Sequence, residues 1–261
     1  MSQGPDAPVA VITGASSGLG LALARRLVGK GLRVVGISRH PEGPAGGVSQ
    51  SLGPRFTAFA GDVADAAQMR RIAAEAEARV GPVAILINNA ATYVRADFLC
   101  TPAEDICRHV EVNLCGQINV TSAFLPFMVD RGHGRIVNVT SFAGEGPLPG
   151  SLGYSVSKSG TRSFSWALAV ELADRMPGIV VTEWAPDMMA THIGTPDGVD
   201  PDLVAALGVT LVLDNDPRLH GATFLRDRQI LSRRSLRRRL KDALLLKPAC
   251  RPIVLVPDQP N

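Results

Sequence analysis

Residues 9–20 read Val-Ala-Val-Ile-Thr-Gly-Ala-Ser-Ser-Gly-Leu-Gly, and they pass from an apolar, β-branched run straight into a glycine-rich turn. Beyond the turn, Leu19, Leu23 and Leu27 recur at intervals of four residues, which predicts an amphipathic helix. In such a strand–turn–helix unit the glycines let the backbone approach a phosphate closely, and the start of the helix offers free N–H groups. A plain strand-to-helix turn has the same pattern, so both interpretations remain open at this point.

Apolar, β-branched runs alternate with helical patterns along the rest of the chain, which favours βαβ units and a parallel sheet. The expected strands are Val9–Thr13, Arg33–Ser38, Phe56–Ala60, Ala84–Asn88, Arg135–Thr140, Ile179–Trp184 and Ala222–Arg226. Several are apolar at successive positions, as expected for strands covered on both faces. The predicted fold class is therefore α/β: a single Rossmann-type, doubly wound domain with a seven-stranded parallel sheet and helices on both faces.

The composition agrees with one folded domain. The chain has 261 residues, of which 46% are hydrophobic and 20% charged, and this balance excludes wholesale disorder. No run approaches the ~20 apolar residues that a membrane span needs, and the first residues do not resemble a secretory signal. The four cysteines form no CxxC pair, which suits a reducing compartment. We therefore expect a cytoplasmic protein with no membrane span and no metal site.

Polar groups with catalytic potential follow the fifth predicted strand, Arg135–Thr140. Tyr154 and Lys158 are spaced i,i+4 and would share one face of a helix. A phenol titrates near pH ~10, and a neighbouring ammonium favours the phenolate, so the pair predicts a tyrosine that exchanges protons. Ser141 ends a predicted strand, where its hydroxyl could bind a carbonyl oxygen beside Tyr154.

These residues, in this order, resemble the short-chain dehydrogenase/reductase family. The motifs are Thr13–Gly20, Asn88-Asn89-Ala90, Asn113, Ser141 and Tyr154–Lys158, within a similarity that spans roughly residues 9–226. The resemblance is to ketoreductase-like members that prefer NADP. It implies that residues 1–230 form a dinucleotide-binding and catalytic domain.

The resemblance also implies four catalytic roles. Tyr154 gives a proton to the carbonyl oxygen, and Ser141 positions and polarises that oxygen. Lys158 lowers the pKa of the tyrosine and binds the nicotinamide ribose. Asn113, in a helix expected at Thr101–Val129, holds a water that continues the proton relay.

The end of the second predicted strand points to the cofactor. An acidic residue there would bind the adenosine 2′-hydroxyl and repel a 2′-phosphate, whereas this chain has Ser38-Arg39. A hydroxyl and a guanidinium suit a phosphate, so we expect NADP(H) rather than NAD(H). The cofactor-binding residues implied by the resemblance are Gly14, Ser16, Ser17, Gly18, Leu19, Gly20, Ser38, Arg39, Asp62, Val63, Asn89, Ala90, Tyr154, Lys158, Pro186 and Thr191.

Two positions depart from the family pattern. Asp187 follows Pro186 where the family has glycine, and Ala91 follows Asn88-Asn89-Ala90 where glycine is frequent. Glycine permits backbone angles that Asp adopts less readily, and a carboxylate beside the nicotinamide would alter substrate choice or cofactor geometry. The expected substrate lid, residues 192–200, is short, which is compatible with a bulky or carrier-tethered substrate.

Residues 231–261 are predicted to form a basic, amphipathic C-terminal extension. They carry eight Lys/Arg and two Asp, a net charge of +6 in a chain of +3, which leaves −3 for residues 1–230. Leu236, Leu240 and Leu244 recur at helical spacing among the basic residues. Such a helix could pack on the parent body or a neighbouring subunit, dock an acidic partner such as an acyl carrier protein, or bind a membrane surface or nucleic acid.

The favoured function is an NADPH-dependent reductase of a small-molecule carbonyl compound. Abundant Ala, Gly and Arg suggest a GC-rich genome and favour specialised metabolism, polyketide-like or another natural-product type. Family relatives imply a homodimer or homotetramer, and no nucleic-acid partner is expected. Two alternatives stay open: a redox-neutral enzyme, such as a dehydratase, epimerase or cyclase, that keeps the tyrosine chemistry, and a nucleotide-sensing regulatory protein.

Overall fold

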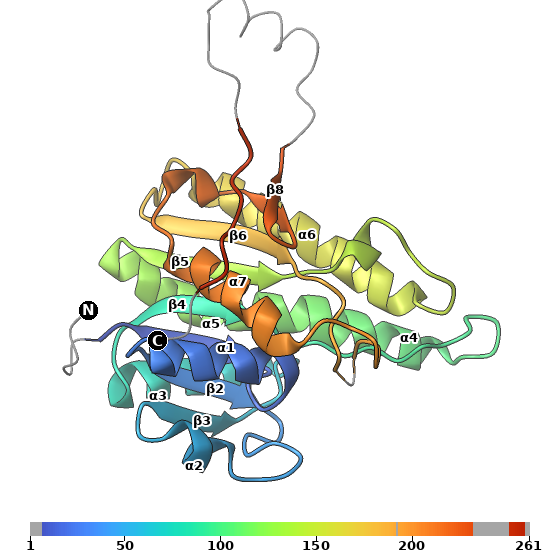
Figure 1. The fold of residues 1–261 in the computed structure, drawn as a ribbon, viewed down its shortest axis with the longest axis horizontal. Coiled ribbons are helices and arrows are strands. Elements are labelled where there is room, and N and C mark those ends of the chain that lie inside the picture. The colour runs from blue at the N-terminus through green and yellow to red at the C-terminus, as the bar shows by residue number, and fades with distance from the viewer. Residues whose placement is uncertain (1–6, 192, 232–250, 259–261) are drawn as a thin grey trace, which may run out of the picture.

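One eight-stranded sheet runs through the molecule, in the order β3-β2-β1-β4-β5-β6-β7-β8 (Figure 1). The structure, a computed structural model, describes residues 7–191, 193–231 and 251–258. The strands are β1 (Val9–Thr13), β2 (Arg33–Ser38), β3 (Phe56–Ala60), β4 (Val83–Asn88), β5 (Gly134–Val139), β6 (Ile179–Ala185), β7 (Thr223–Leu225) and β8 (Arg228–Ile230). Each of the seven predicted strands is present, with both ends within one residue of the prediction.

The sheet has one strand more than the sequence predicts. β1 to β7 are parallel, whereas β8 pairs antiparallel with β7 through a tight hairpin. Arg226 in that hairpin adopts the left-handed conformation, with φ of 57°. β8 was missed because it consists of three residues, among them the polar Arg228 and Gln229, and therefore lacks an apolar run.

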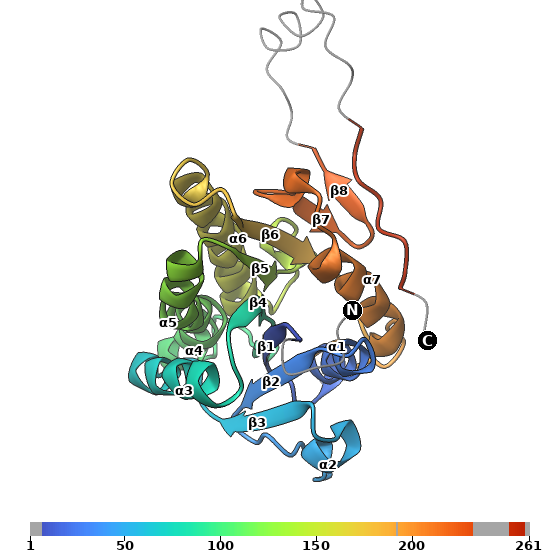
Figure 2. The ribbon, with the colours of Figure 1, turned by 90° about the vertical axis from the view of Figure 1, so that its left-hand side faces the viewer.

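Helices cover both faces of the sheet (Figure 2). They are α1 (Gly18–Gly29), α2 (Val48–Leu52), α3 (Ala66–Arg79), α4 (Ala103–Val110), α5 (Gly116–Arg131), α6 (Leu152–Leu172) and α7 (Pro201–Leu213). α1 and α7 lie on one face, and α3, α5 and α6 lie on the other. This is the doubly wound arrangement expected from the alternating pattern.

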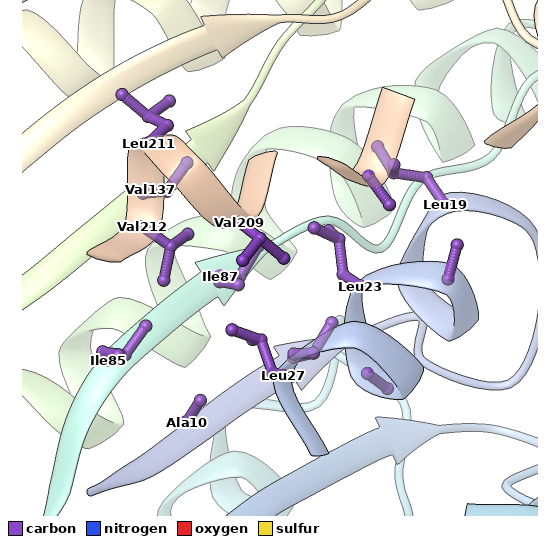
Figure 3. Close-up of a cluster of buried hydrophobic side chains, with 14 of the residues drawn as sticks. Ala10, Leu19, Leu23, Leu27, Ile85, Ile87, Val137, Val209, Leu211 and Val212 are labelled. Atoms are coloured by element: carbon purple, nitrogen blue, oxygen red, sulfur yellow. The ribbon is translucent and has the colours of Figure 1, made fainter. Parts of the chain in front are cut away.

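The two buried faces explain the continuous apolar strands. On one face, Leu23 and Leu27 of α1 meet Val209 of α7 above Ile87 of β4, all fully buried (Figure 3). On the opposite face, Phe124 of α5 is fully buried beside the other side of the same strands. Because successive strand residues point to opposite faces, a strand covered on both sides needs apolar residues at every position.

The predicted helix Thr101–Val129 is a continuous helical run with an irregular centre. α4 and α5 are joined by a π-helical turn, Glu111–Cys115, with Asn113 at its middle. The stretch Ala103–Arg131 is long and apolar enough to cross a membrane, with a mean hydropathy of 1.2. Several of its apolar residues, including Phe124 and Met128, are buried against the sheet, so this side of the run packs as a core helix.

Part of the predicted C-terminal extension is described, and it returns to the body of the protein (Figure 1). Val254 forms an antiparallel bridge with Arg228 of β8, and the Gln229 N–H donates to the Ile253 carbonyl at 2.9 Å. Asp258 forms an ion pair with Lys30, just past α1, at 2.8 Å. The basic helix predicted around Leu236–Leu244 lies outside the described residues.

Candidate active site

A cavity of ≈ 1090 Å³ opens at the carboxyl ends of the parallel strands. Loops that follow neighbouring parallel strands meet at this edge, which is where open α/β sheets bind ligands. Every site residue predicted from the sequence lines the cavity except Gly20 and Asn113.

The turn between β1 and α1 forms one wall. Gly14 and Gly18 have positive φ, 69° and 50°, which side-chain-bearing residues rarely adopt. The first turn of α1 contains no acidic residue, and the Ser17 side chain makes no capping hydrogen bond to it. The positive end of the helix therefore faces the cavity without a carboxylate of its own to neutralise it.

Gly20 acts behind this wall rather than on it. A Cβ at this position would lie 2.1 Å from the Gly14 carbonyl oxygen and 2.7 Å from the Asn89 amide nitrogen. The Asn89 amide nitrogen itself donates to the Thr13 carbonyl at 2.9 Å, and so joins the ends of β1 and β4. Gly20 thus allows helix, turn and strand to pack closely.

The end of β2 carries a buried hydroxyl without a partner. Ser38 Oγ is shielded from solvent, and no described group hydrogen-bonds to it. Arg39 and His40 follow, are exposed, and line the same part of the cavity. His40 was not among the predicted residues because a single histidine in a polar loop gives no signal of its position.

Asp62, which follows β3, lines the cavity and is fixed by contacts from both of its carboxylate oxygens. One carboxylate oxygen accepts the Ala64 N–H at 2.9 Å, and the other lies 3.2 Å from a guanidinium nitrogen of Arg108 in α4. Arg108 also pairs with Glu111 at 3.0 Å. Arg108 lines the cavity but was missed by the sequence analysis, because its partner Asp62 is 46 positions away in the chain.

Ser141, Tyr154 and Lys158 meet at the other end of the cavity. Ser141 follows β5, and it lines the same wall of the cavity as Tyr154, which lies at the start of α6. Lys158 lies one turn further along α6, with its ammonium 5.7 Å from the centre of the Tyr154 ring. That ammonium donates to the Val139 carbonyl at 3.0 Å, which anchors α6 to β5.

Burial dominates the electrostatics of this group. It raises the pKa of Tyr154 above its ordinary value, and the hydrogen bond from Ser141 acts in the opposite direction. Burial lowers the pKa of Lys158 to about 8. Burial of the phenol therefore outweighs the contact that lowers its pKa, because removal from water disfavours the charged phenolate.

Asn113 does not line the cavity, and its side-chain amide is hydrogen-bonded to other groups of the protein. The amide oxygen accepts the Thr92 N–H at 2.7 Å, and the nitrogen donates to the Thr92 carbonyl at 3.0 Å and to Ser157 Oγ at 2.9 Å. Asn113 therefore ties the loop after β4 to the segment of α6 between Tyr154 and Lys158. These contacts fix the position of Asn113 beside α6, and its part in a water-mediated proton relay stays a prediction.

Two residues near Tyr154 were not predicted. Tyr93 packs against Tyr154 with ring centres 4.8 Å apart and planes tilted by 54°. His109 is buried, and its Nε2 accepts the Val94 N–H at 3.0 Å, which fixes the loop that carries Tyr93. Neither forms a local sequence pattern with Tyr154, so only the folded arrangement reveals them.

Asp187 lines the cavity, and its carboxylate is held by an ion pair. Its carboxylate lies 3.1 Å from Nε of Arg226 in the β7–β8 hairpin and accepts the Met188 N–H at 2.9 Å. Among the described non-glycine residues only Arg226 has a positive φ, so Asp187 has an ordinary backbone conformation. The substitution for glycine thus causes no backbone strain at this position.

The segment after β6 closes the remaining side of the cavity. Pro186 and Thr191 line it, and the Thr191 methyl carbon lies 3.1 Å from the position a Cβ on Gly18 would take. Met189 pairs with Val199 in an isolated bridge, which folds the lid segment back on itself. The predicted helix after the lid begins at Pro201, as α7.

A doubly wound parallel sheet, with a glycine-rich turn leading from its first strand into a helix and its cavity at the carboxyl edge, defines a Rossmann-type α/β protein. The chain belongs to the short-chain dehydrogenase family, whose model, described as short chain dehydrogenase, matches residues 8–200. It is an oxidoreductase of the ketoreductase-like kind within that family.

Individual relatives and solved structures agree with this assignment. Nodulation protein G of Azospirillum brasilense is 35% identical over 188 residues, 71% of this chain and 76% of its own. Acetoacetyl-CoA reductase of Cupriavidus necator is 34% identical over 189 residues, again 71% and 76%. The crystal structure of 3-ketoacyl-(acyl-carrier-protein) reductase from Brucella melitensis complexed with NADH has a TM-score of 0.77 and 27% identity, covering 85% of this chain and 97% of that one. A metagenomic short-chain oxidoreductase in complex with NADP has a TM-score of 0.73 and 27% identity, covering 84% and 96%.

Proposed function

We propose that the chain is an NADPH-dependent carbonyl reductase that reduces a ketone, with Asn113, Ser141, Tyr154 and Lys158 as its functional group. The observation that carries the proposal is that Ser141 and Tyr154 line one wall of the cavity together, with a buried lysine one helical turn away. Two hydroxyls that converge on one point can bind a single carbonyl oxygen.

The cavity fits a dinucleotide with a 2′-phosphate. The glycine-rich turn and the start of α1 would hold the pyrophosphate, and Asp62, Val63, Asn89 and Ala90 would line the adenosine. The unpartnered Ser38 hydroxyl and the exposed Arg39 guanidinium would bind the additional phosphate. One of the similar structures holds NADH and another holds NADP, so the proposed preference for NADPH rests on these two side chains.

NADPH bound in the cavity would supply the hydride that reduces the carbonyl carbon. Tyr154 then gives its phenolic proton to the carbonyl oxygen, on which Ser141 has placed a hydrogen bond. Lys158 holds positive charge next to the phenol and so stabilises the phenolate that remains. Asn113 keeps the Thr92 backbone and the middle of this α6 segment in place.

The substrate is proposed to be a small-molecule ketone, either bulky or carried on a larger group, of the kind met in polyketide-like or other natural-product metabolism. The names of an acetoacetyl-CoA reductase and a 3-ketoacyl-(acyl-carrier-protein) reductase among the similar proteins support a β-ketoacyl compound. Phe142, Leu148 and Met188 line the cavity and are partly exposed, which gives its mouth an apolar rim.

We also propose that the enzyme is a cytoplasmic homodimer or homotetramer. Ile118 of α5 and Trp166 and Val170 of α6 are large apolar residues that remain exposed in the single chain. Apolar residues gathered on neighbouring helices favour association. Size-exclusion chromatography with light scattering measures the assembly directly, and a monomer at micromolar concentration would refute this part.

The first test is to titrate the protein with NADPH and with NADH. The shift in nicotinamide fluorescence measures the binding of each dinucleotide. Tighter binding of NADPH is expected, and equal or reversed affinities would refute the Ser38–Arg39 assignment. Acetoacetyl-CoA and simple β-ketoesters then serve as substrates for NADPH oxidation by the wild type and by Tyr154→Phe. The variant should keep NADPH affinity and lose turnover. A redox-neutral enzyme would bind NADPH without consuming it, and a sensor would respond to the nucleotide equally in both proteins.

A further inference from the structure

Glu183 of β6 is a buried carboxylate for which the proposed chemistry has no use. It is 3% exposed, one carboxylate oxygen accepts the Thr140 hydroxyl at 3.1 Å, and the other accepts the Thr223 hydroxyl at 2.9 Å. Its nearby cation is Arg162, with Nε 3.7 Å from the second oxygen. A buried carboxylate is costly unless it is paired, so this arrangement calls for a reason.

Arg162 connects Glu183 to the loop that follows Ser141. It lies on α6, one turn after Lys158, and its side chain is largely covered. The guanidinium also forms an ion pair with Glu145 and packs over the Trp166 ring at 5.3 Å. A single side chain on α6 therefore joins a carboxylate of β6 to a carboxylate just beyond the strand β5.

The two carboxylates reach the chain on either side of Ser141. Thr140, which Glu183 binds, precedes Ser141 directly. Glu145 follows the 3₁₀ turn Phe142–Gly144, which begins at Ser141. Both flanks of Ser141 are thus linked to the same guanidinium.

The turn also contacts α6 through its backbone. The Ser159 hydroxyl donates to the Gly144 carbonyl at 2.6 Å, and a Cβ on Gly144 would lie 3.0 Å from the Ser159 backbone nitrogen. Within the turn, the Ala143 N–H donates to the Ser141 hydroxyl oxygen at 3.2 Å, so the turn orients that hydroxyl. Moving the turn would move the Ser141 oxygen relative to Tyr154.

We propose that the ion chain Glu183–Arg162–Glu145 is a positioning device that holds the Ser141 hydroxyl against Tyr154. The inference rests on the proposed function, in which these two hydroxyls bind the carbonyl oxygen. Arg162 and Glu183 are positioning residues, because neither of them lines the cavity and both act through residues that do. A displacement of about 1 Å at a catalytic group can lower a rate by roughly a hundredfold, so a clamp on Ser141 would matter for turnover.

The first test compares Arg162→Met with Arg162→Lys in the full-length protein. Arg162→Met should lower kcat for ketone reduction by about ten- to a hundredfold and leave the NADPH dissociation constant within about twofold. Arg162→Lys keeps a cation and should recover most of the loss. Arg79→Met, which breaks an exposed ion pair with Glu75 in α3, is the matched control and should turn over as the wild type does. Equal kcat in Arg162→Met and wild type would overturn the inference.

A second measurement does not depend on turnover. The chain has two tyrosines, so tyrosine labelled with ¹³C at Cζ gives two resonances, and Tyr154→Phe assigns them. Ser141→Ala provides the position of the Tyr154 resonance without the serine hydrogen bond. Arg162→Met should move the resonance at least half of the way to that position. A resonance that stays at the wild-type position, in a folded variant, would show that Arg162 has only a structural role.

Glu145→Gln keeps the test open if the buried variants do not fold, because Glu145 is exposed and its replacement leaves the core intact. It should move the same resonance in the same direction, and no movement would count against the clamp. If the wild type reduces no ketone but the resonance moves, the proposed function fails while the positioning of Ser141 stands. If the wild type reduces a ketone but the Tyr154 resonance does not move in the variants, the proposed function stands and the positioning of Ser141 by the ion chain fails.

Discussion

Replacing Lys158 with Met takes a buried ammonium out of the protein while nearly keeping the length of the side chain. Lys158 is 3% exposed, and burial lowers its pKa from 10.5 to about 8. One pKa unit corresponds to about 1.4 kcal/mol, so this shift destabilises the folded protein by on the order of 3 kcal/mol at neutral pH. The substitution should remove that cost and, with it, ketone reduction.

The sign follows from the direction of the shift. Below pH 8 both the folded and the unfolded wild type hold the proton, and the cost is present in full. Between about 8 and 10.5 the unfolded chain binds a proton that the folded protein has released, so the stability contributed by this group rises with pH by about 1.4 kcal/mol per unit. Lys158→Met lacks this rise, and its advantage over the wild type must shrink in that window.

A second effect opposes the gain at neutral pH. The Lys158 ammonium donates to the Val139 carbonyl at 3.0 Å, and Met leaves this buried carbonyl without that partner. An unpaired buried group costs about 1–3 kcal/mol, which offsets much of the expected stabilisation. This loss does not vary with pH, so the pH dependence of the difference between the two proteins isolates the buried charge.

Urea unfolding of both proteins at pH 7 and pH 9.5 measures that difference. From pH 7 to pH 9.5, the stability of the variant relative to the wild type should fall by roughly 2 kcal/mol. Lys30→Met is the control, since it removes an ammonium that pairs with Asp258 near the surface, and no such change is expected. The same difference at both pH values would refute the assignment of Lys158 as a buried, destabilising charge.

Three further substitutions test other parts of the site. Arg39→Ala should raise the KM for NADPH by about 10- to 100-fold, the value of one charge-assisted hydrogen bond, and leave the KM for NADH unchanged; equal effects on both would contradict a phosphate contact. Gly20→Ala places a Cβ 2.1 Å from the Gly14 carbonyl oxygen and should lose dinucleotide binding and thermal stability, whereas Gly29→Ala, with open space around the new Cβ in the same helix, should retain both. Asp187→Gly breaks a mostly exposed ion pair and should cost at most about 1 kcal/mol in thermal unfolding, with NADPH affinity kept within twofold; a large loss of affinity would show that the carboxylate does orient the cofactor.

Much of the fold could be predicted from the sequence because its signals are local. The strands from Val9 to Leu225 are buried on both faces, and their apolar runs mark them within one residue. The predicted residues at strand ends, such as Ser38, Asp62 and Ser141, come together because parallel strands deliver their carboxyl ends to one edge. The positions of these strand-end residues follow from the order of the strands alone, without knowledge of any long-range side-chain contact.

The features that were missed depend on such contacts. Arg108 reaches Asp62, Arg226 reaches Asp187, and Arg162 lies between two carboxylates, and none of these pairings leaves a spacing pattern in the chain. The contacts of the Asn113 side chain with the Thr92 backbone were missed for the same reason. Hydrogen-bonding capacity can be read from a residue type, but its partner is decided by the packing.

Residues 251–258 pair with β8, so the C-terminal region is not a free tail: its last described part belongs to the edge of the sheet. Because Ile253 and Val254 pair with the strand that precedes residue 231, the segment 232–250 is attached at both ends to one hairpin. Cutting the chain at residue 231 would therefore remove more than an appendage: it would uncover the edge of β8 and release the Lys30–Asp258 ion pair. An uncovered edge invites pairing with another chain, so such a truncation should aggregate, whereas excision of residues 232–250 with the ends rejoined by a short linker should stay soluble.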